Sequence, residues 1–296
     1  MENKVNLSFI LAVGLMLFSF FFGAGNLIFP PVLGQLAGEH TFLATLGFCI
    51  SGVGLPLLGI VAMTSNKYKG PDEAGTPVSP LYARIILVLC ALSIGPFFAI
   101  PRTAATSFNA GIMLLLNSDL EFIGMIVYSV IFFAIAYWMA IHPSKIIDVL
   151  GKAMTPVLLI GLVMLVGAAF FGTNDLNVAA QGAYVTQPLT KGILEGYNTM
   201  DLLCAMLFGS ATIAVIETQG FVSEKDFLKI TLYAGFIAAF FLGIVYAALA
   251  YVGLVSVGSI GLIDNGALLL SKVCTHYYGS AGAIILALTF FLACIT

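Results

Sequence analysis

The sequence predicts an all-α polytopic integral membrane protein. Of its 296 residues, 60% are hydrophobic and only 8% are charged, and the mean hydropathy is +1.09. Soluble domains carry about 25% charged residues. The hydrophobic residues also gather in long runs, and about 20 apolar residues suffice for a helix to cross a bilayer.

These runs predict eight spans within a single membrane domain, residues 1–296. The spans lie at about residues 7–36, 41–64, 79–116, 120–140, 154–172, 188–216, 226–255 and 279–296. The first run begins after six residues and exceeds the apolar core of a signal peptide, so we expect it to remain in the protein. The last run reaches Thr296 without a polar flank, and we therefore expect the sequence to be truncated within its eighth span.

The basic residues predict the orientation. With a cytoplasmic N-terminus, eight of the eleven Lys and Arg residues face the cytoplasm: Lys4, Lys67, Lys69, Arg84, Lys145, Lys152, Lys225 and Lys229. Only Lys191 and Lys272 then lie outside, and Arg102 lies within a span. Because cytoplasmic loops carry an excess of Lys and Arg, the N-terminus is predicted to be cytoplasmic.

Several classes of function are disfavoured. The net charge is −3 and no basic patch occurs, so we expect no nucleic-acid partner. Five cysteines show no disulfide or metal spacing, and His40 and His142 lack a metal-ligating neighbour. No nucleophilic serine elbow, P-loop or dinucleotide fingerprint is found, so we expect neither an enzyme nor an organic cofactor.

Residues 22–31, FGAGNLIFPP, predict an interruption in the first span. Gly23 and Gly25 each weaken a helix by about 1 kcal/mol relative to Ala. Backbone that unwinds at membrane depth must be buried in protein or face a polar cavity, so the stretch is a candidate ligand site. Close packing of helices through small residues is the alternative interpretation.

Residues 195–201, EGYNTMD, are a second polar cluster with a glycine and predict a break in the sixth span. An ionisable group within a span costs about 2.5 kcal/mol or more, which makes Asp201 a candidate. Asp201 is predicted to pair with Arg102 or to sense a proton, or else to begin a helix outside the hydrocarbon.

Arg102 follows Pro101, which is predicted to kink the third span because proline removes a helix hydrogen bond. The side chain either contacts a carboxylate, from a substrate or an acidic partner, or extends to the outer interface. Further on, residues 256–278 are half apolar and predict a short external helix that is capped by Asp264 or Asn265.

Residues 22–31 and 195–201, together with GPFFAIPRT at 95–103, resemble the bacterial branched-chain amino acid carrier family. The resemblance extends along the whole chain. The resemblance implies a cation-coupled symporter that imports leucine, isoleucine and valine across the bacterial cytoplasmic membrane. It also implies a LeuT-like inverted-repeat fold with broken helices 1 and 6. The first repeat would comprise about residues 1–172, and a partial second repeat about residues 188–296.

The resemblance also implies roles for particular residues. Ala24, Gly25 and Asn26, with Gly23, would hold the substrate carboxylate, and Tyr197 and Phe208 would line the apolar pocket. Ser19 and Phe22 would face a sodium ion through their carbonyls. Residues 293–296, ACIT, match the start of the motif that completes such an ion site, so Ala293 and Thr296 are cation candidates. Arg102 and Asp201 would serve gating or coupling.

The predicted partners are therefore the substrate and the bilayer, and the predicted coupling ion is Na⁺ or H⁺. A carrier for another small neutral amino acid is the main alternative, and a channel is a weaker one. A hydrophobic pocket discriminates between substrates that differ by one methylene by only about 1–3 kcal/mol, so we expect all three branched-chain amino acids to be accepted.

Overall fold

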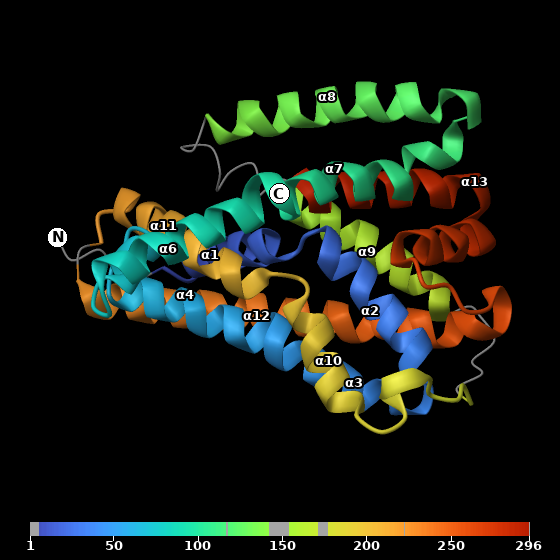
Figure 1. The fold of residues 1–296 in the computed structure, drawn as a ribbon, viewed down its shortest axis with the longest axis horizontal. Coiled ribbons are helices and arrows are strands. Elements are labelled where there is room, and N and C mark those ends of the chain that lie inside the picture. Colours follow the sequence, from blue (N-terminus) through green and yellow to red (C-terminus); the bar gives the residue numbers. More distant parts are fainter. Residues whose placement is uncertain (1–5, 117, 142–153, 171–176, 222, 296) are drawn as a thin grey trace.

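The structure is a computed structural model that describes residues 6–116, 118–141, 154–170, 177–221 and 223–295, and its regular elements in these ranges are all helices (Figure 1). The α-helices are α1 (Leu7–Phe21), α2 (Ala24–Ala37), α3 (Thr41–Cys49), α4 (Leu55–Ser65), α5 (Pro71–Gly75), α6 (Pro80–Leu92), α7 (Ala99–Ala110), α8 (Glu121–Ala140), α9 (Thr155–Phe170), α10 (Pro188–Tyr197), α11 (Asp201–Thr218), α12 (Glu224–Ile260) and α13 (Gly266–Ile295). In the described part of the chain, six helical stretches are long and apolar enough to cross a membrane. The all-α polytopic class is thereby confirmed.

The first predicted span contains two helices, α1 and α2. Phe22 and Gly23 lie between them, and Gly23 has an extended backbone with φ of −109° and ψ of −168°. Gly25 is helical, because it already belongs to the first turn of α2. The interruption is therefore shorter than the two glycines suggested.

The sixth predicted span also contains two helices, α10 and α11. Residues 198–200 separate them, and Met200 has a φ of +66°. Residues other than glycine rarely adopt this left-handed conformation, since their Cβ crowds the backbone. Met200 redirects the chain so that α11 begins at Asp201.

The interruption in the third predicted span differs from our expectation. We predicted a kink at Pro101, but α6 ends at Leu92 and the backbone departs from helical geometry at Gly95, next to Pro96. Pro101 is the third residue of α7. The first N–H groups of a helix have no acceptor within it, so proline is tolerated there.

The short helix that was predicted after Asn265 is present as the first part of α13. The Asn265 side chain caps it by accepting hydrogen bonds from the N–H groups of Ala267 and Leu268 at 3.0 and 3.1 Å. At Gly279, φ is +59° and the helix kinks. The second part of α13 then continues to Ile295 and contains the eighth predicted run.

The 37-residue α12 is the central packing element. It lies along both α1 and α2, while α10 packs on α3 and α11 packs on α4. The α13 helix packs against α2, α7 and α9. By contrast, α8 lies at the edge, where it contacts mainly α7 (Figure 1). The ends of the interrupted helices thus face one another inside the bundle.

Two glycines allow the backbones of α2 and α12 to approach closely. A Cβ on Gly34 would overlap the carbonyl group of Ala250, and a Cβ on Gly253 would overlap that of Pro31. Membrane helices commonly pack through such small residues, since lipid supplies no hydrophobic drive for their association. This contact fixes the position of α2.

We expect Gly34→Ala to destabilise the protein by about 1–3 kcal/mol, because the added methyl group meets a backbone carbonyl that cannot move independently. Thermal unfolding of the purified protein in detergent measures the effect. Gly243→Ala, on α12, is the control because a Cβ there has no neighbour within 4 Å. Equal melting temperatures for the two variants would contradict this account of the crossing.

Candidate functional site

A cavity of about 280 Å³ lies where the ends of the interrupted helices meet. Its walls come from α1, α2, α7, α8, α11 and α13 and from the loops at the interruptions. Nine of the twelve predicted site residues line it, namely Ser19, Gly23, Ala24, Gly25, Asn26, Arg102, Asp201, Phe208 and Ala293. Residues from distant parts of the sequence therefore share one site.

The N-terminus of α2 forms one wall of this cavity. Its first helical hydrogen bond runs from the N–H of Leu27 to the carbonyl of Gly23, so the N–H groups of Ala24, Gly25 and Asn26 precede it. Such groups have no acceptor within a helix and carry the positive end of the helix dipole. This wall is suited to an anionic group.

The side chain of Asn26 connects three elements. Its Oδ1 accepts a hydrogen bond from the N–H of Gly23 at 3.2 Å, and its Nδ2 donates to Asp201 Oδ2 at 2.7 Å. The same Nδ2 donates to the Tyr246 hydroxyl on α12. Asn26 and Asp201 are 2% and 5% exposed, and Tyr246 is fully buried. The amide therefore holds the helix interruption and the carboxylate together.

Arg102 provides the opposite charge. Its guanidinium carbon lies 5.8 Å from the centre of the Phe29 ring, and its Nη2 is 3.3 Å from the position that a Cβ on Gly25 would take. Its Nε is buried without a hydrogen-bond partner. Within the described residues, no ion pair joins Arg102 to Asp201. Both charges thus line the cavity separately.

Aromatic side chains cover the part of the cavity next to α1 and α11. The Phe208 ring stacks on Phe20 with centroids 4.8 Å apart and meets Phe21 edge-on at 5.5 Å. Further lining residues from α8 are Phe132 and Phe133. The cavity thus combines an apolar surface with a small number of charged groups, as ligand sites in proteins do.

Two of the predicted cation ligands also lie at the cavity. The Ser19 hydroxyl is buried without a hydrogen-bond partner. The carbonyl oxygen of Ala293 lies 3.9 Å from the Cβ position of Gly23. The unpaired hydroxyl adds an oxygen atom to the carbonyl that was predicted as the Ser19 ligand, and hard cations prefer oxygen ligands.

Three predicted site residues are not among the lining residues. Tyr197 is 51% exposed at the end of α10. Phe22 is fully buried, and its ring stacks on Phe18 at 5.3 Å. Thr296 lies outside the described residues. The left-handed turn at Met200 explains the position of Tyr197, since it brings Thr199 to the cavity instead.

Tyr246 is the main residue that the sequence did not indicate. It lies in the middle of an apolar span, where one hydroxyl among eleven tyrosines gives no pattern. Its position in the middle of a predicted span was the one feature that could have singled it out, because tyrosines in membrane helices usually lie near the interfaces. Phe132 likewise had no signal among 24 phenylalanines.

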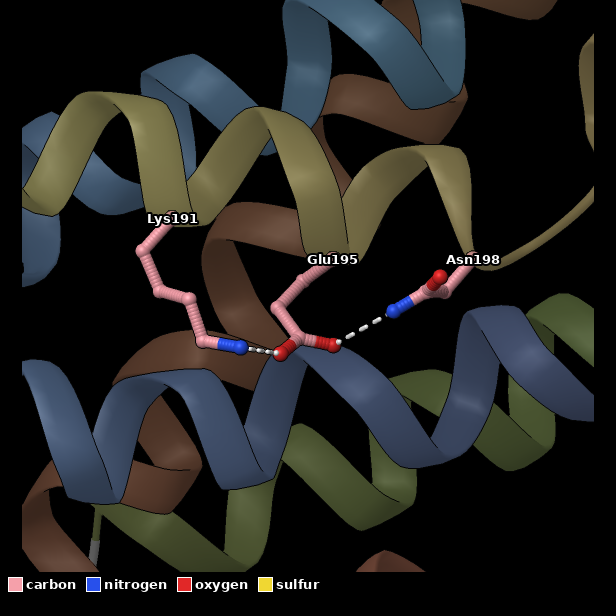
Figure 2. A network of polar contacts seen from close by, with 3 residues as sticks. All are labelled: Lys191, Glu195 and Asn198. Atoms are coloured by element: carbon pink, nitrogen blue, oxygen red, sulfur yellow. Dashed lines mark hydrogen bonds and ion pairs between the residues drawn. The ribbon is translucent and has the colours of Figure 1, made fainter. Parts of the chain in front are cut away.

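A second cavity, of about 520 Å³, lies on the other side of Phe29. Its lining includes Glu195 and Asp264. The Glu195 carboxylate is 2.6 Å from Lys191 Nζ and accepts a hydrogen bond of 3.3 Å from Asn198 (Figure 2). Phe29 lines this cavity and contacts Arg102, which lines the smaller one.

Comparison with known proteins identifies similar sequences. The family model described as branched-chain amino acid transport protein matches residues 6–296. The branched-chain amino acid permeases BrnQ and BraB of Bacillus subtilis are 41% and 38% identical over all of this chain. BrnQ of Escherichia coli K12 is 35% identical, also over all of it.

This chain covers 67%, 66% and 66% of those three relatives, or about two thirds of their length. The relatives are named as permeases and not as enzymes, which agrees with the class predicted from the sequence. Together with the six long apolar helices, they identify a multi-pass membrane protein.

We expect Asn26→Ala to destabilise the protein more than Tyr246→Phe does. The phenylalanine variant loses one hydrogen bond, which is worth about 0.5–1.5 kcal/mol. The alanine variant loses three and leaves a buried carboxylate without its amide donor. Thermal unfolding in detergent tests the order, with Tyr233→Phe as an exposed control. Equal stability of the two site variants would contradict the connecting role of Asn26.

Proposed function

Because the chain belongs to the family of branched-chain amino acid transport proteins, as its motifs predicted, we propose that it is a cation-coupled symporter for leucine, isoleucine and valine. The observation that carries the proposal is the cavity at the helix ends. It combines apolar walls with one carboxylate and one guanidinium. A branched-chain amino acid needs this combination, because it has two charged groups and a hydrocarbon side chain.

The substrate carboxylate is assigned to the N-terminus of α2. The N–H groups of Ala24, Gly25 and Asn26 precede the first helical hydrogen bond and favour an anion there. Arg102 adds a positive charge beside Gly25. Phe208 and the phenylalanines around it provide the surface for the branched side chain. Gly23 provides the extended turn into α2.

The coupling cation is assigned to the oxygen atoms near Ser19 and Ala293. Sodium needs oxygen ligands, and the unpaired Ser19 hydroxyl supports its assignment to this place. The carbonyl of Phe22 and the hydroxyl of Thr296 remain proposed ligands of the same ion. Coupling to protons through Asp201 is the alternative, and ion-replacement experiments distinguish the two.

The proposed architecture is a LeuT-like inverted repeat. Residues 1–172 would form the first repeat and residues 188–296 part of the second. The paired helices α1 and α2, and α10 and α11, support this arrangement, because each pair would begin one of the proposed repeats. Transport would proceed by alternating access, with Arg102 and Phe29 at the gate between the two cavities. The N-terminus would face the cytoplasm of a bacterial cell.

We expect purified protein in lipid vesicles to accumulate labelled leucine above equilibrium when sodium is outside, and not when choline replaces it at the same pH. A sodium gradient can drive such accumulation only if the two fluxes are coupled. Accumulation that follows an imposed proton gradient instead would identify protons as the coupling ion. Mere equilibration would indicate a channel, and competition by alanine but not by isoleucine or valine would indicate another neutral amino acid carrier.

We expect Gly25→Val to abolish leucine uptake. A Cβ at this position lies 3.3 Å from Arg102 Nη2 and 3.3 Å from the Phe29 ring, so the larger side chain fills the space beside the N-terminus of α2. Gly243→Val is the matched control because its Cβ position is open. Near-normal uptake by folded Gly25→Val protein would exclude this part of the cavity as the substrate site.

A further inference from the structure

The carboxylate of Asp201 is buried beside the cavity, and Arg102 interacts with it only across a distance, without a direct ion pair. Asp201 is 5% exposed, and in the described part of the chain no ion pair reaches it. A buried charge is costly unless it is paired and hydrogen-bonded. The amide of Asn26, the hydroxyl of Thr199 and the N-terminus of α11, which Asp201 begins, stabilise the charge without neutralising it.

The surrounding contacts fix the position of this carboxylate. Asn26 donates to Asp201 Oδ2, while its own orientation is set by the N–H of Gly23 and the hydroxyl of Tyr246. The amide oxygen is used by a donor and the amide nitrogen by two acceptors. Rotating the Asn26 amide to exchange its oxygen and nitrogen would therefore lose these hydrogen bonds. The Asp201 carboxylate is thus held in place at the cavity.

The cavity also carries the opposite charge at a separate place. Arg102 lies over Phe29 and beside Gly25, and its Nε has no partner. Two opposite charges that line one cavity without pairing are complementary to a ligand that carries both charges. The apolar side chains that line the same cavity suit the hydrocarbon part of such a ligand.

We propose that Asp201 binds the ammonium group of the substrate, with Asn26 and Tyr246 as positioning residues, while Arg102 faces the substrate carboxylate in the same cavity. This inference rests on the proposed transport of branched-chain amino acids and specifies how their ammonium group is recognised. Free α-amino acids are then distinguished from the corresponding carboxylic acids by one buried carboxylate.

The neighbours of Asp201 favour an ammonium group over a sodium ion. One of them is the Nδ2 of Asn26, a nitrogen donor that cannot serve as a sodium ligand, so the carboxylate and the Thr199 hydroxyl are the side-chain oxygens at this place. The unpaired oxygen atom in the cavity wall belongs to Ser19 on α1, a different element. An ammonium group donates up to three hydrogen bonds and needs only one carboxylate oxygen together with neutral acceptors.

Equilibrium binding to the purified full protein, measured by competition with labelled leucine in sodium buffer, tests the assignment with three ligands. Leucine carries both charges, 4-methylpentanoate lacks the ammonium group, and 3-methylbutylamine lacks the carboxylate. We expect Asp201→Asn to weaken binding of leucine and 3-methylbutylamine roughly 10- to 100-fold, as loss of a charge-assisted hydrogen bond does. Binding of 4-methylpentanoate should not weaken.

Two further variants complete the design. Arg102→Gln should give the reverse pattern, with weaker binding of leucine and 4-methylpentanoate and little change for the amine. Asp201→Glu retains the charge and should recover part of the leucine affinity. Glu224→Gln removes an exposed carboxylate at the start of α12 and serves as the control, with the binding of all three ligands unchanged.

Several results would overturn the inference. They are an equal loss of affinity for all three ligands in Asp201→Asn, unchanged leucine binding in that variant, or a change confined to its sodium dependence. The inference would also be overturned if wild-type protein bound 4-methylpentanoate as tightly as leucine. Wild-type protein that binds no branched-chain amino acid contradicts the proposed function itself, so the two failures are distinguishable.

Discussion

A backbone that leaves helical geometry inside an apolar bundle must find other partners for its polar groups. In hydrocarbon, each unsatisfied group costs several kcal/mol. At Gly23, the Asn26 side chain contributes to this requirement because its oxygen accepts from the N–H of Gly23, which also reaches the carbonyl of Phe21. Its nitrogen donates to Asp201 and Tyr246, so satisfying one interruption also ties it to α11 and α12. The site therefore follows from the hydrogen-bond requirements of an interrupted helix.

The close crossing of α2 and α12 keeps this arrangement in place. Gly34 and Gly253 let the two backbones touch on the same helices that carry Asn26 and Tyr246. A hydrogen bond between side chains in a membrane contributes about 0.6 kcal/mol on average, which is too little to hold two helices in position. Close packing must therefore set the distance, and the hydrogen bonds then select the orientation of the side chains.

The sequence indicated the helices and the region of the site, but not all of the geometry. Apolar runs and glycines are local signals, so the all-helical class and the helix interruption next to Gly23 could be predicted from them. Thr199 and not Tyr197 lines the cavity because Met200 adopts a left-handed conformation that no local pattern specifies. The interruption of the third span lies at Gly95, where ψ is −114°, and not at Pro101 as the sequence suggested. Tyr246 became significant only through a contact 220 residues away along the chain.

The separation of Asp201 from Arg102 is maintained by other contacts. A direct ion pair between two charges in one cavity would gain electrostatic energy in a low dielectric. Here Asn26 donates to the carboxylate, while the guanidinium lies over the Phe29 ring, a weaker contact of about 0.5–2 kcal/mol. Each charge is thus partly stabilised by a neutral group and remains able to interact with a ligand. Such an arrangement would favour a zwitterion over an anion or a cation alone, because only a zwitterion compensates both charges at once.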